Sequence, residues 1–273
     1  MRLHSKFLMI ATVAGSLLCS CTGEKSEEKD DAEDETINAV LDSQKISAQN
    51  VFNALPERDQ VISLATASGS EYNPVLLNDP NSVNKYSTES SKALNLGVYG
   101  ADLNATGVYE QTQESMLFLK CVNILAKSLG VSNSFDEKMV DRMTVNKSNR
   151  DSTLEIVSQS FKSADKYLKD NGRPGTSSLI VAGAWIEGIY LAVNTAKETK
   201  NDAIAKEIYK QKESLKYLIQ LLEQSKIAEN ASYIVNDLKQ LEPLFDNTAG
   251  TVASLTALDK ASSGLRTKVI SGN

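Results

Sequence analysis

The sequence predicts an all-α protein, folded as an antiparallel helical bundle. No segment keeps the alternation of apolar and polar residues that a half-buried strand requires. From residue 88 onward, apolar side chains recur every three or four positions instead. Proline, which breaks helices, is absent between Pro80 and Pro174 and between Pro174 and Pro243. Because long helices joined by short loops pack as bundles, we expect one all-α domain over residues 37–273.

The first part of this domain is the least regular. Residues 47–55 and 57–66 are predicted as short helices separated by Pro56, and residues 69–86 as a long ordered loop rich in proline and asparagine. Two longer helices, over 88–104 and 106–129, are expected to follow.

A capping box then marks the next helix start. Ser134 and Glu137 stand three residues apart, so each side chain can bind a free backbone amide. A helix over 150–170 follows, and the segment 171–175, which contains Gly172, Pro174 and Gly175, ends it. Its apolar residues form one seam: Leu154, Val157, Phe161, Ala164 and Leu168.

Four more helices complete the chain, over residues 176–199, 202–224, 227–246 and 255–270. The last three each carry one apolar face. In order along the chain, the faces consist of Ile204, Ile208, Leu215, Leu218 and Leu222; Ala231, Ile234, Leu238, Leu241 and Phe245; and Leu255, Leu258, Leu265 and Val269.

The amino terminus has the features of an export signal. Arg2 and Lys6 precede the apolar stretch 7–18, which is too short to span a bilayer. The stretch ends Leu18-Cys19-Ser20-Cys21, which resembles the lipobox of bacterial lipoproteins. This resemblance implies that residues 1–20 are a signal peptide, and that Cys21 becomes the amino terminus and attaches to membrane lipid. An ordinary secretory signal with an incidental cysteine is the alternative.

An acidic tether is predicted over residues 21–36. Eight of the 14 residues in 22–35 are acidic and only Lys25 and Lys29 are basic, so the segment should be extended and disordered. It resembles the signals that export some lipoproteins to the outer face of the outer membrane; an outer-membrane location, on either face, is therefore expected. The rest of the mature chain has 25 basic and 27 acidic side chains, too balanced to attract nucleic acid.

Histidine is confined to the expected signal peptide, at His4. A mature chain without histidine lacks Ser-His and Cys-His nucleophile pairs and histidine-containing metal sites. Phosphate-binding, Cys-x-x-Cys, EF-hand and Gly-x-Ser-x-Gly motifs are also absent. We therefore expect no catalytic residue, no metal and no cofactor. Cys121 stands among apolar residues and is predicted to be a buried structural thiol.

Two of the helices share a pattern of small residues. Ala, Gly, Tyr, Ala and Ala recur at an offset of 91 residues, in a stripe that lets two helix backbones approach closely. A weaker match relates residues 114–119 to 213–218. The matches indicate a duplicated unit over 88–170 and 176–248, with chance similarity of alanine-rich helices as the alternative. The repeated residues are Ala93, Gly97, Tyr99, Ala101 and Ala105, and Ala184, Gly188, Tyr190, Ala192 and Ala196; Gly97 and Gly188 are expected at a tight helix crossing.

Segments 95–102 and 185–192 also resemble a group of uncharacterised Gram-negative envelope lipoproteins. The resemblance implies a compartment and no activity.

Polar residues inside these two apolar helices are the candidate site. Asn95 and Asp102 share one helix face, as do Glu187 and Asn194. Burying carboxylates is costly unless they are paired, so these groups should meet either a partner within the bundle or a ligand. The candidates for ligand binding are Asn95, Asp102, Glu187, Asn194, Tyr99 and Tyr190.

These observations predict a lipid-anchored envelope protein that binds an unknown small molecule or protein partner without catalysis. An extracytoplasmic sensor or a structural accessory subunit of an envelope complex is the second interpretation. An enzyme that uses carboxylates and tyrosine is the third.

Overall fold

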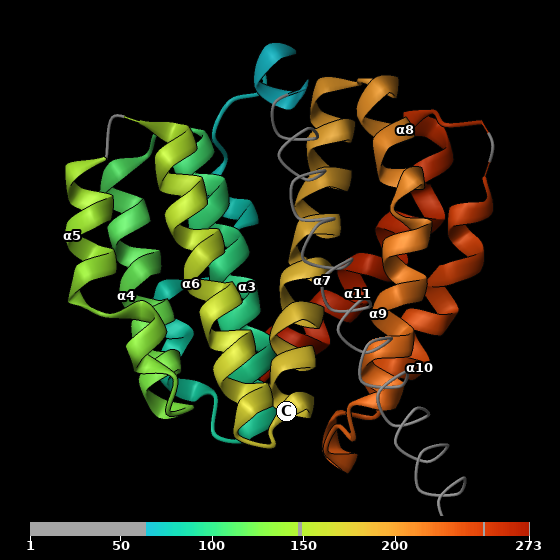
Figure 1. Cartoon of the computed structure of the whole chain (residues 1–273). Helices are drawn as coiled ribbons and strands as arrows, with labels where there is room; N and C mark the ends of the chain where they lie inside the picture. Colours follow the sequence, from blue (N-terminus) through green and yellow to red (C-terminus); the bar gives the residue numbers. More distant parts are fainter. Residues whose placement is uncertain (1–63, 147–148, 248, 273) are drawn as a thin grey trace, which may run out of the picture. The chain divides into compact units, whose positions relative to one another are not determined.

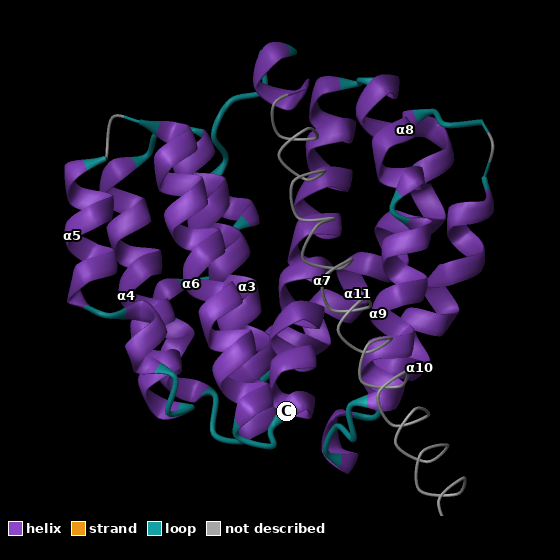
Figure 2. Ribbon diagram, in the orientation of Figure 1, coloured by secondary structure: helices purple, strands orange, loops and turns teal. Residues whose placement is uncertain are grey.

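The fold is all-α, as the sequence predicts (Figure 2). The structure is a computed structural model that describes residues 64–146, 149–247 and 249–272, and no strand occurs in these ranges. The expected signal peptide, Cys21, the expected acidic tether and the expected helix 47–55 all lie outside the described residues.

The long helices follow one another with short connections (Figure 1). The α-helices are α3 (Glu89–Val108), α4 (Thr112–Ser128), α5 (Glu137–Val145), α6 (Arg150–Asp170), α7 (Pro174–Thr199), α8 (Asp202–Lys210), α9 (Lys212–Gln224), α10 (Tyr233–Leu241) and α11 (Thr256–Ser271). Short 3₁₀ helices are η1 (Pro74–Leu76), η2 (Pro80–Lys85), η3 (Ser132–Phe135), η4 (Glu229–Ala231), η5 (Glu242–Asp246) and η6 (Val252–Leu255).

Several element boundaries differ from the prediction. The side chain of Asp136, not Ser134, caps α5 by accepting a hydrogen bond from the Met139 amide, because Ser134 is already part of η3. The expected helix 202–224 is divided into α8 and α9 at Gln211, whose ψ of 0° departs from helical geometry. Pro243 divides the expected helix 227–246, since proline cannot donate the next helical hydrogen bond.

The predicted apolar faces form the core. In α8 and α9, Ile204, Ile208 and Leu215 are fully buried, and the faces of α10 and α11 are buried as well. Cys121 is 3% exposed and is therefore a core residue, as predicted, and Trp185, 4% exposed, belongs to the core as well. Periodicity therefore predicted burial correctly even where it merged neighbouring helices.

The most extensive helix–helix contact joins α3 and α7. Helices joined by short loops reverse direction at each step, so α7, four helices after α3, runs in the same direction as α3 (Figure 1). Leu94 lies against Gly183 near one end of the pair, and Ala105 and Ala192 line one pocket near the other. The pair at the centre of the fold is therefore parallel.

Two glycines allow this close approach. A Cβ atom on Gly97 would lie 2.6 Å from the Ala184 nitrogen, and one on Gly183 would lie 2.7 Å from the Leu94 carbonyl carbon. Real Cβ contacts are essentially never shorter than 3.0 Å. Gly97 thus lies at a crossing, as predicted, but its counterpart on α7 is Gly183. Gly188 lines a pocket further along the helix instead, because α3 and α7 are closest one turn earlier.

Helix α7 is long and apolar enough to cross a membrane, with a mean hydropathy of 1.5 in its most apolar stretch. However, 78% of that stretch is buried inside the protein. This combination is typical of the central helix of a globular core.

Candidate functional site

Three charged side chains meet in the interior at the α3–α7 interface. Glu187 of α7 is fully buried and forms a two-pronged ion pair with Arg266 of α11, with Nε–Oε2 and Nη2–Oε1 distances of 2.7 and 2.8 Å. Asp102 of α3, also fully buried, is the third member. The sequence-predicted carboxylates therefore come together, and the partner they require is an arginine within the fold.

Burial disfavours the charged form of Asp102. Burial and the neighbouring Glu187 carboxylate raise the pKa of Asp102 well above its usual range, and Arg266 offsets this only partly. Oδ1 of Asp102 accepts no hydrogen bond, although its side chain interacts with that of Glu187. Burial therefore favours the neutral form of the Asp102 carboxyl beside the Glu187–Arg266 ion pair. The cluster is then neutral overall, as its buried position requires.

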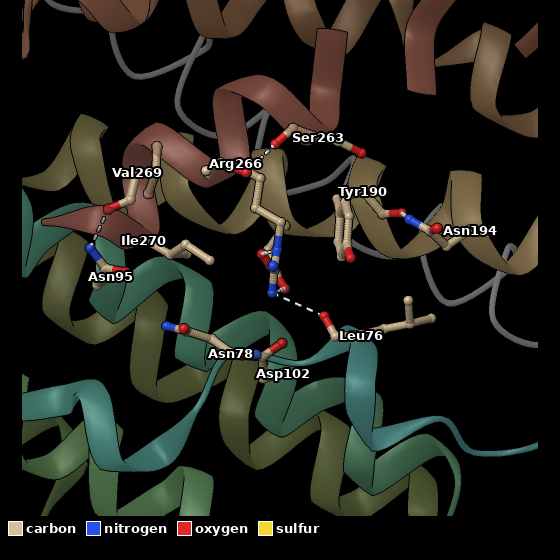
Figure 3. A network of polar contacts seen from close by, with 12 residues as sticks. Leu76, Asn78, Asn95, Asp102, Tyr190, Asn194, Ser263, Arg266, Val269 and Ile270 are labelled. Carbon is tan, nitrogen blue, oxygen red and sulfur yellow. Dashed lines mark hydrogen bonds and ion pairs between the residues drawn. The ribbon is translucent and has the colours of Figure 1, made fainter. Parts of the chain in front are cut away.

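The cluster also fastens the loop segment 76–79 to the helices (Figure 3). Arg266 Nη2 donates to the Leu76 carbonyl at 2.9 Å, and the backbone N–H of Asn78 donates to Asp102 Oδ2 at 3.2 Å. The Tyr99 hydroxyl donates to the Asp79 carbonyl at 2.8 Å. Two of the predicted site residues, Asp102 and Tyr99, thus hold the backbone that joins η1 to η2.

The remaining predicted site residues have partners in the protein. Asn95 Nδ2 donates to the carbonyls of Ser91 and Val269, which joins α3 to α11, while Asn95 Oδ1 is buried without a partner. Asn194 Nδ2 donates to the carbonyl of Tyr190 in its own helix. These two asparagines lie outside the charged cluster.

The two repeated tyrosines differ in their surroundings. Tyr99 is fully buried, with its ring centre 6.2 Å from those of Tyr86 and Phe118. Tyr190 is partly exposed and packs against Arg266, whose Cζ lies 4.1 Å from the ring centre, close enough for a cation–π interaction. Tyr99 is therefore a core residue, whereas Tyr190 shields the guanidinium.

Sequence reasoning missed Arg266. The residue follows Leu265 and lies eight positions after Leu258, so it falls at the edge of the apolar face of α11. The sequence did contain one signal for this contact. Two other apolar helices contain carboxylates that need a partner, and this arginine stands at the edge of an apolar face.

A pocket opens beside this cluster, where α3 and α7 separate beyond their crossing. Its cavity volume is about 60 Å³. Glu71 and Glu198, both exposed, stand at its mouth. Small residues of the two stripes and apolar side chains of the fastened loop line it: Ala101, Ala105, Gly188, Ala192, Leu76 and Leu77.

Two tyrosines form a wall of this pocket. The rings of Tyr72 and Tyr109 lie 5.8 Å apart with an interplanar angle of 53°. The Tyr72 hydroxyl donates to the Glu114 carboxylate, and the Tyr109 hydroxyl is hydrogen-bonded to Ser70 Oγ at 3.1 Å. These bonds hold both rings in place. Neither tyrosine was among the sequence-predicted site residues, because Tyr72 lies in the loop 69–86, which carries no periodic signal, and Tyr109 lies at the end of α3.

Within the described ranges, no three His, Cys, Asp or Glu residues are grouped so that they could hold a metal ion. No protein-family model, curated protein or solved structure matches this chain. A function is therefore inferred from the pocket and from the buried cluster that supports its wall.

Proposed function

We propose that this protein is a non-enzymatic binding module of the bacterial cell envelope, anchored through lipid on Cys21. The observation that carries the binding role is the pocket between the diverging ends of α3 and α7. The space remains between the helices because their facing side chains are small. The buried Asp102, Glu187 and Arg266 hold in place the loop that covers it. A preformed concave site with an apolar lining and few polar groups is typical of small-molecule binding.

Filling the pocket tests the binding role. Ala105→Leu places a larger apolar side chain among the lining residues, and Ala203→Leu makes the same change at an exposed position of α8. Fragment screening by ligand-detected NMR should find small molecules that bind the parent and the Ala203→Leu variant but lose binding to Ala105→Leu. Equal binding to all three proteins would place the site elsewhere and refute the proposal.

The anchor has its own test. Mass spectrometry of the mature protein should find residue 21 at the amino terminus with acyl groups, since several acyl chains anchor firmly and one only marginally. Cys21→Ala should abolish acylation, whereas Cys19→Ala keeps an acceptable lipobox residue and should leave it unchanged. A soluble, lipid-free native protein would refute the anchor. Co-purification from the intact envelope distinguishes a bound small molecule from a stoichiometric protein partner.

A further inference from the structure

The charge around the pocket has one sign. Two carboxylates, Glu71 and Glu198, are among the described residues that line it, and these contain no lysine or arginine. A third carboxylate, Glu114, binds the hydroxyl of the lining residue Tyr72. Burial, together with the hydrogen bond and the charge of Glu114, raises the pKa of Tyr72 above its usual range.

Helix ends add to this negative field. Because α3 and α7 are parallel, the carboxyl-terminal ends of both helices border the same pocket. Ala105 belongs to the last turn of α3, and Glu198 belongs to the last turn of α7. The aligned peptide dipoles of a helix give its carboxyl-terminal end a partial negative charge, which favours a nearby cation.

The tyrosine wall suits a cation as well. The faces of aromatic rings carry partial negative charge and attract ammonium groups within about 6 Å. The hydroxyls of Tyr72 and Tyr109 already form hydrogen bonds with Glu114 and Ser70. These hydrogen bonds hold the two rings in place. A hard divalent ion would need about six oxygen ligands, a far denser set than two exposed carboxylates.

From these observations we infer that the pocket binds a small organic cation, an ammonium group on a short apolar chain. This inference rests on the proposed binding function. The ammonium group lies near Glu71 and Glu198, and the apolar chain lies on the floor formed by the small residues of α3 and α7. The cavity volume of about 60 Å³ fits a chain of only a few carbons, and the exposed mouth admits a longer one.

Three probes of similar shape and different charge test this inference: n-butylammonium, 1-butanol and butyrate. The chain is produced without residues 1–20 and with Cys21→Ser, and affinities are measured by NMR titration at low salt. We expect butylammonium to bind at least tenfold more tightly than 1-butanol, and butyrate not to bind. Added salt should reduce only the advantage of the cation, because screening weakens exposed charge interactions.

Charge variants locate the preference. In the Glu71→Gln, Glu198→Gln double variant, butylammonium should bind within about twofold of 1-butanol, with the affinity for 1-butanol unchanged. Glu155→Gln, at an exposed position of α6 outside the pocket, is the matched control and should behave as the parent.

The outcomes separate the two proposals. If 1-butanol binds as well as butylammonium, the cation inference is wrong and the binding function stands. A cation preference that survives in the double variant also overturns the inference. If no probe binds, both the inference and the proposed pocket are wrong.

Discussion

Adding one methyl group at the α3–α7 crossing should destabilise the protein. Glycine to alanine in an exposed helix stabilises by up to about 1 kcal/mol, because alanine is the better helix former. At Gly97, however, the new Cβ would lie 2.6 Å from the Ala184 nitrogen, whereas ordinary van der Waals contact begins at 3.4 Å. Relieving this contact alone requires a separation of about 0.8 Å, and the Ile180 carbonyl oxygen lies closer still, so the helices would have to move further apart. The obstacle is backbone, so no side-chain rotation can relieve the contact.

Overpacking of this kind costs typically about 1–3 kcal/mol. Since the contact is with backbone in both cases, we expect Gly97→Ala and Gly183→Ala to lose about 2 kcal/mol or more, despite the gain in helix propensity. Gly264→Ala is the matched control, because Gly264 is an exposed residue of α11 with nothing within 4 Å of its Cβ position. That variant should be more stable than the parent. Denaturant unfolding measures all three, and a Gly97→Ala or Gly183→Ala protein as stable as the parent would refute the tight crossing.

Three further predictions concern buried ionisable groups. Glu187→Gln and Arg266→Met should each lower the free energy of unfolding by roughly 3–5 kcal/mol, because each leaves a buried charge unpaired. In urea unfolding, the double variant should lose less stability than the two single variants together. Asp102 binds its proton more tightly when folded, so its contribution to stability is complete below its unfolded pKa of about 3.8 and is lost as the pH rises through its folded value. Asp102→Asn should therefore gain stability relative to the parent from pH 4 to pH 8, and a pH-independent difference in urea midpoints would contradict the raised pKa of Asp102. Burial raises the pKa of Cys121 to about 11, so its thiol should react slowly in the folded protein at pH 7. In a Cys19→Ser, Cys21→Ser chain, a disulfide reagent should modify it far more slowly when the chain is folded than when it is unfolded. Equal rates would argue against its burial.

Helix periodicity predicted the fold class and most of the core. The apolar faces assigned to the last helices are buried because a three-to-four residue spacing places those side chains on one side of a helix whatever it packs against. Boundaries were less predictable, because they depend on single side chains such as Asp136 and Pro243 that act locally at a helix end. The parallel direction of α3 and α7 follows only from counting the helices between them.

The site was only partly predictable for a similar reason. Asp102 and Glu187 stood out as polar residues in apolar helices, but their partner Arg266 comes from α11, 79 residues after Glu187. Nothing in the spacing along the chain indicates such a contact. Tyr72 and Tyr109 come from a loop and from a helix end, where no repeating pattern distinguishes a wall of a pocket from an exposed side chain.

The stripe of small residues explains why a crossing and a pocket occur together. Two straight helices that touch backbone to backbone at Gly97 and Gly183 must separate on either side of that point. Where large side chains follow, they fill the widening gap, but here the stripe continues with Ala101 and Ala105 on one helix and Gly188 on the other. The gap must then be covered by another part of the chain, and the loop that carries Leu76 and Leu77 covers it. A loop cannot bury its backbone carbonyl and amide groups without partners, so the charged cluster beneath it supplies them through Arg266 and Asp102. Asp102, Glu187 and Tyr99, which the sequence marked as ligand-binding candidates, therefore support the loop over the pocket. Ala101, Ala105, Gly188 and Ala192, which the sequence marked as packing residues, line it.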